Sequence, residues 1–172
     1  YLLSIVCAIL CTLSKKQPGS ANFDSREVKP TVMFDTLTMK LSSNDLDLVQ
    51  AALEILVKFT HRQQRKGFVD SNSRSDGIAA VLEAMQHYTE LEHIQELACS
   101  ALCNLLFSSP QLCKTIIVQK GGIDTIVAVM RRYIRNATIQ KNACTMLWSI
   151  ASGNAENKSS IARSGGIFCI VS

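Results

Sequence analysis

Apolar residues recur at helical spacing in four segments of the 172-residue chain. In each segment they stand at positions i, i+4 and i+7, which form one face of an α-helix. The four sets are Val6, Leu10 and Leu13; Ala52, Leu56 and Phe59; Ala98, Leu102 and Leu105; and Ala143, Leu147 and Ile150. Successive sets begin 46, 46 and 45 residues apart, and self-similarity at such a period indicates a stack of repeated units. The pattern predicts one long helix in each of four units.

A second apolar pattern precedes the long helix in two units. Its matching positions are Ile78, Val81, Leu82 and Met85 in one unit and Ile123, Ile126, Val127 and Met130 in the next. These runs follow Asp76-Gly77 and Gly121-Gly122, and a third copy starts at Gly166. Because glycine takes a positive φ without strain, the glycines predict a helix end followed by a sharp turn. An equivalent helix is expected within residues 32–41, in a register that the sequence leaves open.

Shorter helical runs at 111–119 and 156–163 precede two of the glycine pairs. The asparagines of GNAEN, residues 153–157, are typical N-caps for the second run. Each unit is thus predicted to contain a short helix, a glycine corner, a middle helix, a polar link and a long helix.

The repeats divide the chain into seven parts. These are a partial repeat with only its third helix at 1–14, a polar insertion at 15–30, a repeat at 31–61, a polar link at 62–76, repeats at 77–108 and 109–153, and a partial repeat at 154–172. The insertion and the link are rich in polar residues, which favours elongated connections.

Composition limits the classes of protein that fit this pattern. Apolar residues make up 47% and charged residues 19%, which indicates a folded chain. The net charge of +4 is too small for the basic stripe of a dedicated nucleic-acid binder. The opening YLLSIVCAILCTL is shorter than the roughly 20 residues that span a bilayer, and it lacks the basic start of a signal peptide. We interpret it as the first copy of the long helix, expect no membrane span, and take the chain, which starts at Tyr1, as an excerpt of a longer one.

The seven cysteines are odd in number and lie mostly within apolar helical runs. Reduced cysteines that serve as small core residues behave in this way, so we expect a cytoplasmic or nuclear protein. The i, i+4 pairs Cys7/Cys11 and Cys99/Cys103 have no histidine nearby to complete a four-ligand zinc site. The three histidines form no pattern with Ser, Cys or Asp that points to catalysis. We therefore expect no metal, no cofactor and no enzymatic activity.

The stretch ACTMLWSIASGNAENKSSIARSGGI, residues 143–167, carries a family resemblance. It resembles armadillo repeats, in which a phrase like ALWNLA is followed by an asparagine-rich cap and then by GGI. The resemblance spans nearly the whole chain and is strongest in 77–172. HEAT repeats pair helices at a similar period but lack this glycine corner. The resemblance implies an all-α, right-handed solenoid in which the third helices line a concave groove that holds an extended peptide or a partner helix.

The resemblance also implies which positions line the groove. In importin-α-like members, asparagines there bind the ligand backbone and a tryptophan one turn earlier packs its side chains. The asparagine position matches Thr12, Lys58, Asn104 and Ser149 here, and the tryptophan position matches Ala8, Glu54, Ser100 and Thr145. One asparagine and no tryptophan remain, which argues against recognition of nuclear localisation signals in the importin manner. The lysine row of β-catenin's groove is absent too.

These observations predict a non-catalytic scaffold that binds a protein or peptide partner on the concave face. The candidate residues are Lys58, Asn104, Trp148 and Ser149, with Asn104 bonding to the ligand backbone and Trp148 providing an apolar contact. For Trp148, packing between repeats is an equal alternative.

Two other functions stay open. Basic clusters at 61–66 and 131–135 would bind nucleic acid or an anionic membrane if they converged on one side of the molecule. Their members are Arg62, Arg65, Lys66, Arg131, Arg132 and Arg135. The other alternative is a spacer that orients a catalytic domain in a larger multidomain enzyme.

Overall fold

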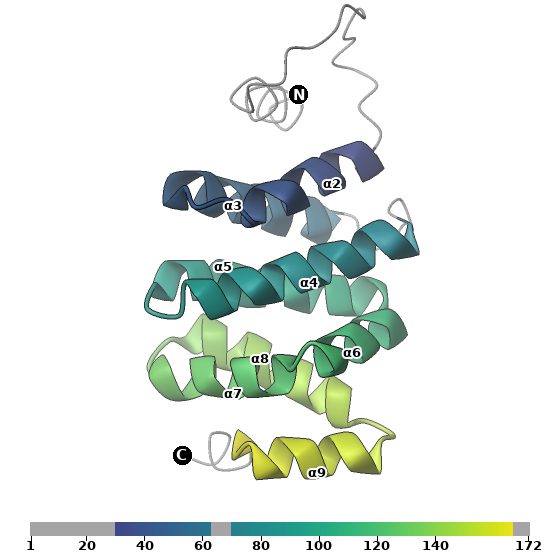
Figure 1. The fold of residues 1–172 in the computed structure, drawn as a ribbon. Helices are drawn as coiled ribbons and strands as arrows, with labels where there is room; N and C mark the ends of the chain where they lie inside the picture. Colours follow the sequence, from purple (N-terminus) through teal and green to yellow (C-terminus); the bar gives the residue numbers. More distant parts are fainter. Residues whose placement is uncertain (1–29, 63–69, 167–172) are drawn as a thin grey trace, which may run out of the picture.

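The computed structural model describes residues 30–62 and 70–166, and all regular structure within them is helical. The helices are α2 (Pro30–Leu41), α3 (Leu46–Arg62), α4 (Ser71–His87), α5 (Glu92–Ser108), α6 (Pro110–Gln119), α7 (Gly122–Arg132), α8 (Ala137–Ala151) and α9 (Ala155–Arg163). They stack in chain order (Figure 1). The predicted repeat at 1–14 and most of the insertion at 15–30 lie outside the described residues.

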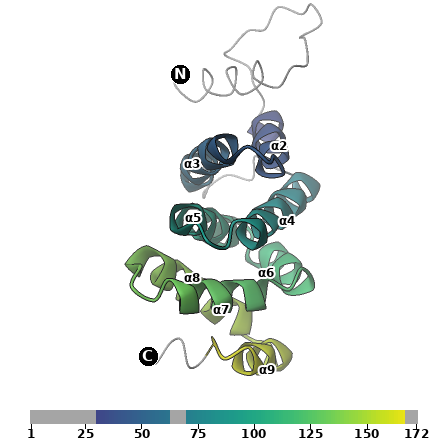
Figure 2. The same cartoon turned by 60° about the vertical axis from the view of Figure 1, so that its left-hand side comes forward.

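The helices form two layers. The long helices α3, α5 and α8 lie beside one another in one layer, and α2, α4, α6 and α9 lie in the other (Figure 2). Ala52, Ala98 and Ala143, the first positions of the predicted long helices, have no exposed surface. Small side chains there let neighbouring long helices approach closely. One continuous core of buried residues runs through all the described units.

Polar side chains at corresponding positions join the units. The Nε2 of Gln95 donates to the carbonyl oxygens of Met85 and Tyr88, and the Nε2 of Gln140 makes the same two bonds one unit later. The hydroxyl of Tyr88 donates to the carbonyl of Ser43, as that of Tyr133 does to the carbonyl of Thr89. Each glutamine closes the turn before its long helix, and each tyrosine ties that turn to the preceding unit.

Capping residues set the starts of several helices. The side chain of Asp45 accepts from the backbone amides of Asp47 and Leu48. Asn136 and Asn154 cap α8 and α9 through the amides three residues later. Asn154 thus has the capping role that the sequence predicted for the asparagines of GNAEN, whereas the side chain of Asn157 donates to the carbonyl of Ile150.

The glycine corner occurs as predicted at Gly121 and Gly165. Their φ angles of 68° and 78° are in the left-handed region, where glycine avoids the strain that other residues suffer. The second glycine of each pair is needed for close approach: a Cβ on Gly122 would lie 2.9 Å from the carbonyl oxygen of Ile117. At the turn between α6 and α7, Gly121 thus relieves backbone strain and Gly122 allows close packing.

The unit around Asp76 and Gly77 differs from the prediction. Residues 71–76, predicted as the end of a polar link, form the first turns of α4, which runs without a break from Ser71 to His87. Asp70 caps this helix by accepting from the amides of Asn72 and Ser73. Gly77 is buried inside the helix, so its role is close packing rather than a turn. The three-helix unit is complete in α6, α7 and α8, whereas in the described residues of the preceding unit one continuous helix precedes the long helix.

The structure also resolves the register of α2. A Cβ on Gly77 would meet the hydroxyl oxygen of Thr38, just as one on Gly122 would meet Leu82. Thr38 is therefore the counterpart of Leu82, which places buried Phe34, Leu37 and Leu41 at the positions of Ile78, Val81 and Met85.

Candidate functional site

The long-helix layer carries two rows of polar residues that cross α3, α5 and α8. One row contains Lys58, Asn104 and Ser149, and the other, one turn earlier, contains Glu54, Ser100 and Thr145. Lys58 is exposed, and the other five residues are half-buried. The structure thus places three of the four predicted binding residues at equivalent positions of successive helices.

Asn104 already has partners inside the molecule. Its Nδ2 donates to the carbonyl oxygen of Val57 at 3.3 Å and to the hydroxyl of Thr60 at 3.2 Å. Both acceptors belong to α3, so Asn104 joins two neighbouring long helices. Its predicted role at a ligand backbone stays a prediction, because these bonds would have to be exchanged on binding.

Other contacts between the long helices are not evident from the repeat pattern. The Nδ2 of Asn142 donates to the hydroxyl of Ser100 at 3.0 Å. The Nδ2 of Asn136 donates to carboxylate oxygens of Glu92 and Glu96. These residues do not recur at the repeat interval, so the sequence period does not predict their contacts. The pairs Gln95/Gln140 and Tyr88/Tyr133 do recur at that interval, and their contacts could have been predicted from it.

Two aromatic side chains are exposed on the long helices. Trp148 on α8 is 75% exposed, and Phe107 on α5 is 61% exposed. Phe107 lies three residues after Asn104 and therefore on the same side of its helix. The repeat pattern gives no role to Phe107, although it is an aromatic residue one turn beyond a predicted groove position.

The described residues of the two basic clusters lie at opposite ends of the long helices. His61 is near the end of α3, where Thr60 contacts Asn104 of α5. Arg131 and Arg132 end α7 beside Tyr133, which bonds to the turn before α5. The 17 residues of α5 separate the two ends, a length of about 25 Å. Arg62 is the last residue of α3, while Arg65 and Lys66 lie outside the described residues.

Two arginines of the second cluster have partners within the molecule. Arg131 donates to the carbonyl oxygen of Ser164 at 2.8 Å, at the end of α9. Arg132 pairs with the carboxylate of Glu90 and lies over the ring of Tyr133. Arg135 is exposed. The described part of the chain therefore does not bring the clusters together on one surface.

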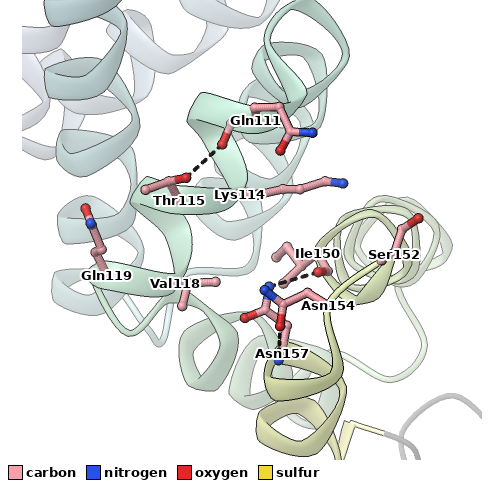
Figure 3. A pocket seen from close by; sticks show the side chains of 10 residues that line it. Gln111, Lys114, Thr115, Val118, Gln119, Ile150, Ser152, Asn154 and Asn157 are labelled. Carbon is pink, nitrogen blue, oxygen red and sulfur yellow. Dashed lines mark hydrogen bonds between the residues drawn. The ribbon is translucent and has the colours of Figure 1, made fainter.

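A polar pocket of about 410 Å³ lies between α6 and the corner from α8 to α9 (Figure 3). Its lining includes Gln111, Lys114, Asn154 and Asn157. The Nδ2 of Asn157 donates to the carbonyl oxygen of Ile150 within it. Amide and hydroxyl groups predominate in the lining, and it contains no carboxylate or histidine to transfer a proton.

Cys99, Cys103 and Cys113 are buried thiols whose surroundings do not favour reactivity. Burial raises the pKa of Cys99 and that of Cys113 to about 12. Because the thiolate is the nucleophile and the metal ligand, both groups are inert at neutral pH. Residues 30–62 and 70–166 contain no group of three metal-ligating side chains. Within the same ranges no helix is both long and apolar enough to cross a membrane.

Comparisons with known proteins agree with this architecture. A family model described as LRRK2 ARM repeat matches residues 2–164. Protein aardvark of Dictyostelium discoideum is 27% identical over 152 residues, which cover 83% of this chain and 20% of that protein. The crystal structure of an engineered protein superposes with a TM-score of 0.62 at 19% identity, covering 97% of this chain and 60% of that one. The matched part of this chain thus spans a fifth of the length of Protein aardvark. The engineered protein has the same fold as this chain.

The helical stack, the glycine corners and the match of the family model lead to one assignment. Armadillo repeats form scaffolds that typically mediate protein interactions. Because the model covers most of the sequence, the chain belongs to the LRRK2 ARM repeat family.

Proposed function

We propose that this chain is a non-catalytic scaffold that binds an extended peptide or a partner helix across α3, α5 and α8. The observation that carries the proposal is the pair of polar rows that cross these three helices. A ligand that crosses the stack meets a side chain of the same row at each helix, so contacts add along its length. Repeat arrays favour this kind of binding because they present a long surface without needing a deep cavity.

The surface along the first row differs in chemistry from one helix to the next. Lys58 offers a cation on α3 and Ser149 a hydroxyl on α8, and Phe107, one turn beyond the row, offers an exposed ring on α5. This order of surface groups suits a ligand that presents an acidic group, then an apolar side chain, then a polar backbone group. Asn104 is left out of this set because its amide joins α3 and α5.

The free, buried thiols support a reducing compartment, and we place the protein in the cytoplasm or nucleus. Cys99, Cys103 and Cys113 fill the core as small apolar residues. Nothing in the described residues offers an alternative role for them in catalysis or metal binding.

Peptides selected from a random library on the immobilised chain would test the groove. Lys58→Glu and Phe107→Ala should each weaken the selected peptides at least about tenfold, which corresponds to 1.4 kcal/mol. The matched control is Lys120→Glu, because Lys120 is an exposed cation at the corner between α6 and α7, in the other layer. Circular dichroism melts should show that all three variants remain folded.

Two results would contradict the proposal. One is peptide binding that Lys58→Glu and Phe107→Ala leave unchanged. The other is binding that falls steeply with salt and is lost in Arg135→Glu, which would favour the electrostatic alternative.

A further inference from the structure

Three turns lead into the long helices, and they lie in a row along one edge of the stack, at the left in Figure 1. Tyr88 and Tyr133 each tie their own turn to the preceding one by donating to a carbonyl oxygen there. The row is therefore a fixed part of the molecule, with one turn in each unit. We call this row and the helix ends beside it the turn edge, which consists of residues 39–47, 83–93 and 128–138.

The middle turn has a leucine where the other two turns have capping residues. Asp45 and Asn136 occupy the equivalent positions and cap α3 and α8 through side-chain oxygens. Leu91 precedes α5 without forming a side-chain cap and is 36% exposed. Leucine is among the poorest N-cap residues. This position thus has neither a cap nor burial in the described part of the chain, and a contact with another molecule accounts for a leucine there.

The turn edge exposes further large apolar side chains. Met39, Leu46 and Ile134 are 73%, 39% and 56% exposed. With Leu91 they make up half of the eight large apolar side chains that are exposed in the described residues. Isolated surface residues of this kind need no explanation, but a group that follows one edge marks an interaction surface.

The charges of the turn edge change sign from one end to the other. The first turn and the start of α3 carry two aspartates and no basic side chain, whereas the end of α7 and the third turn carry three arginines and no carboxylate. In the middle, Glu90 pairs with Arg132. Glu92 accepts a hydrogen bond from Asn136 at 2.9 Å. The edge is therefore acidic at one end and basic at the other, with Leu91 between them.

A surface of this kind is complementary to a second copy of itself in the opposite direction. A two-fold axis through the middle turn, perpendicular to the stack, sets the first turn of each copy against the third turn of the other. Asp47 and Arg135, which are exposed, then face each other across the contact. Every contact occurs twice because of the symmetry, and Leu91 at the axis meets Leu91 of the second copy.

The same axis provides a place for the most exposed of these apolar side chains. Met39 on α2 and Ala128 on α7 are at equivalent positions, because each directly follows the counterpart of Leu82 in its own unit. Ala128 lines a cavity of about 460 Å³ next to the third turn, with Val129 and Thr89 also in its wall. An antiparallel pair brings Met39 of one copy to this cavity on the other. A methionine side chain is unbranched and flexible, so it fits an irregular space.

We propose that the turn edge is a homodimer interface, in which two copies of this chain pair antiparallel with Leu91 at the two-fold axis. A second copy is the occupant because the edge itself carries both charges of the ion pair and both members of the apolar contact. The proposal is independent of the groove function. Lys58, Phe107 and Ser149 lie toward the other ends of the long helices, so the dimer leaves the groove open.

Sedimentation equilibrium of the 172-residue chain tests the dimer directly. Between about 5 and 200 µM, a range that detects weak dimers, the average mass should rise from 18.9 kDa toward twice that value. Asp47→Lys and Arg135→Glu should each raise the dissociation constant at least about tenfold, because like charges then meet twice in each dimer. The matched control is Lys158→Glu, which changes the net charge as Arg135→Glu does. Lys158 is exposed on α9, outside the turn edge, so the constant should stay unchanged.

A mixture of the two charge variants tests the antiparallel arrangement. In a heterodimer of the Asp47→Lys chain with the Arg135→Glu chain, one ion pair keeps its original sign and the other is reversed. No like charges then face each other. The mixture should therefore dimerise as the original chain does, while each variant alone stays largely monomeric.

Leu91→Asp separates the interface from the fold. Aspartate is a favourable N-cap, so the thermal midpoint, measured below the dimer range, should stay equal or rise. Dimer formation should be lost, because two carboxylates would meet at the axis. Phe107→Ala is the control for lost apolar surface and should leave the dimer unchanged, since Phe107 is more exposed than Leu91 but lies outside the turn edge.

Three outcomes would overturn the proposal. The first is a chain that stays monomeric over the whole concentration range. The second is a dimer that Leu91→Asp and both charge variants leave intact, as when Trp148 forms the contact. The third is a mixture of the charge variants that stays monomeric although the original chain dimerises, since the turns would then not pair antiparallel.

Discussion

Two junctions at equivalent places in the stack have opposite geometries. At Asp76-Gly77 the helix α4 continues without a break, whereas at Gly121-Gly122 the chain turns between α6 and α7. The second residue of both junctions is glycine. A side chain there would clash with Phe34 at Gly77 and with Ile117 at Gly122. The first residue differs, because Asp76 replaces a glycine that has a φ of 68°. The comparison separates two roles of glycine, close packing and left-handed backbone, that a GG motif combines.

The difference also changes what surrounds each junction. Helix α4 packs along both α2 and α6, whereas α7 makes few contacts with α4. Between the end of α4 and α7 a cavity of about 460 Å³ is left, lined in part by Thr89, Ala128 and Val129. The straight helix α4 cannot lie parallel to both α6 and α7, because the chain turns between them. The cavity lies on the α7 side of that turn.

The largest effect is expected at the bent junction, from Gly122→Ala. The new methyl carbon would lie 2.6 Å from the Cγ2 of Ile117 and 2.9 Å from its carbonyl oxygen. A backbone oxygen cannot move aside as a side chain can, so we expect a loss of about 3 kcal/mol in the free energy of unfolding, the upper end of overpacking costs. Chemical denaturation followed by circular dichroism measures the change. A loss below that of Gly77→Ala would show that the corner opens easily.

An intermediate effect is expected at the straight junction, from Gly77→Ala. The methyl group would overlap the ring of Phe34, which is fully buried. Alanine gains roughly 1 kcal/mol over glycine inside a helix, which offsets part of the overpacking, so the net loss should be about 1–2 kcal/mol. Phe34→Leu in the Gly77→Ala background should recover part of it, and the double-mutant cycle gives the coupling. Strict additivity of the two changes would refute the contact as the cause.

The long helices and the turning glycines were predictable from the sequence because both follow local rules. The i, i+4, i+7 ladder gives a helix face, and Gly121 and Gly165 follow runs that end before them. Gly77 was misread because its position in the alignment matches Gly122. What decides its role is packing against Phe34, which lies 43 residues earlier in a helix of open register.

The candidate site was predictable in position but not in contacts. The repeat places Lys58, Asn104 and Ser149 in one row, as expected from their alignment. The acceptors of Asn104, however, are a backbone carbonyl and a hydroxyl on α3, and no local rule identifies them. The exposure of Trp148 likewise depends on which helix lies next to α8. The arrangement of the helices in the stack sets that exposure, and the residue type does not.

The smallest effects are expected from exchanging the first residue between the junctions. Gly121→Asp would place a side chain at a φ of 68°, with open space around it. The cost is then backbone strain alone, about 1 kcal/mol. Asp76→Gly would put a second glycine into α4 at a cost of about 0.5 kcal/mol from helix propensity. Neither variant should alter the helical content measured by circular dichroism, because the packing of Gly77 and Gly122 holds each junction in its present form. If Asp76→Gly instead lowers the helical signal of α4, the first residue alone selects between a straight helix and a corner, and the packing of Phe34 against Gly77 is a consequence of that choice.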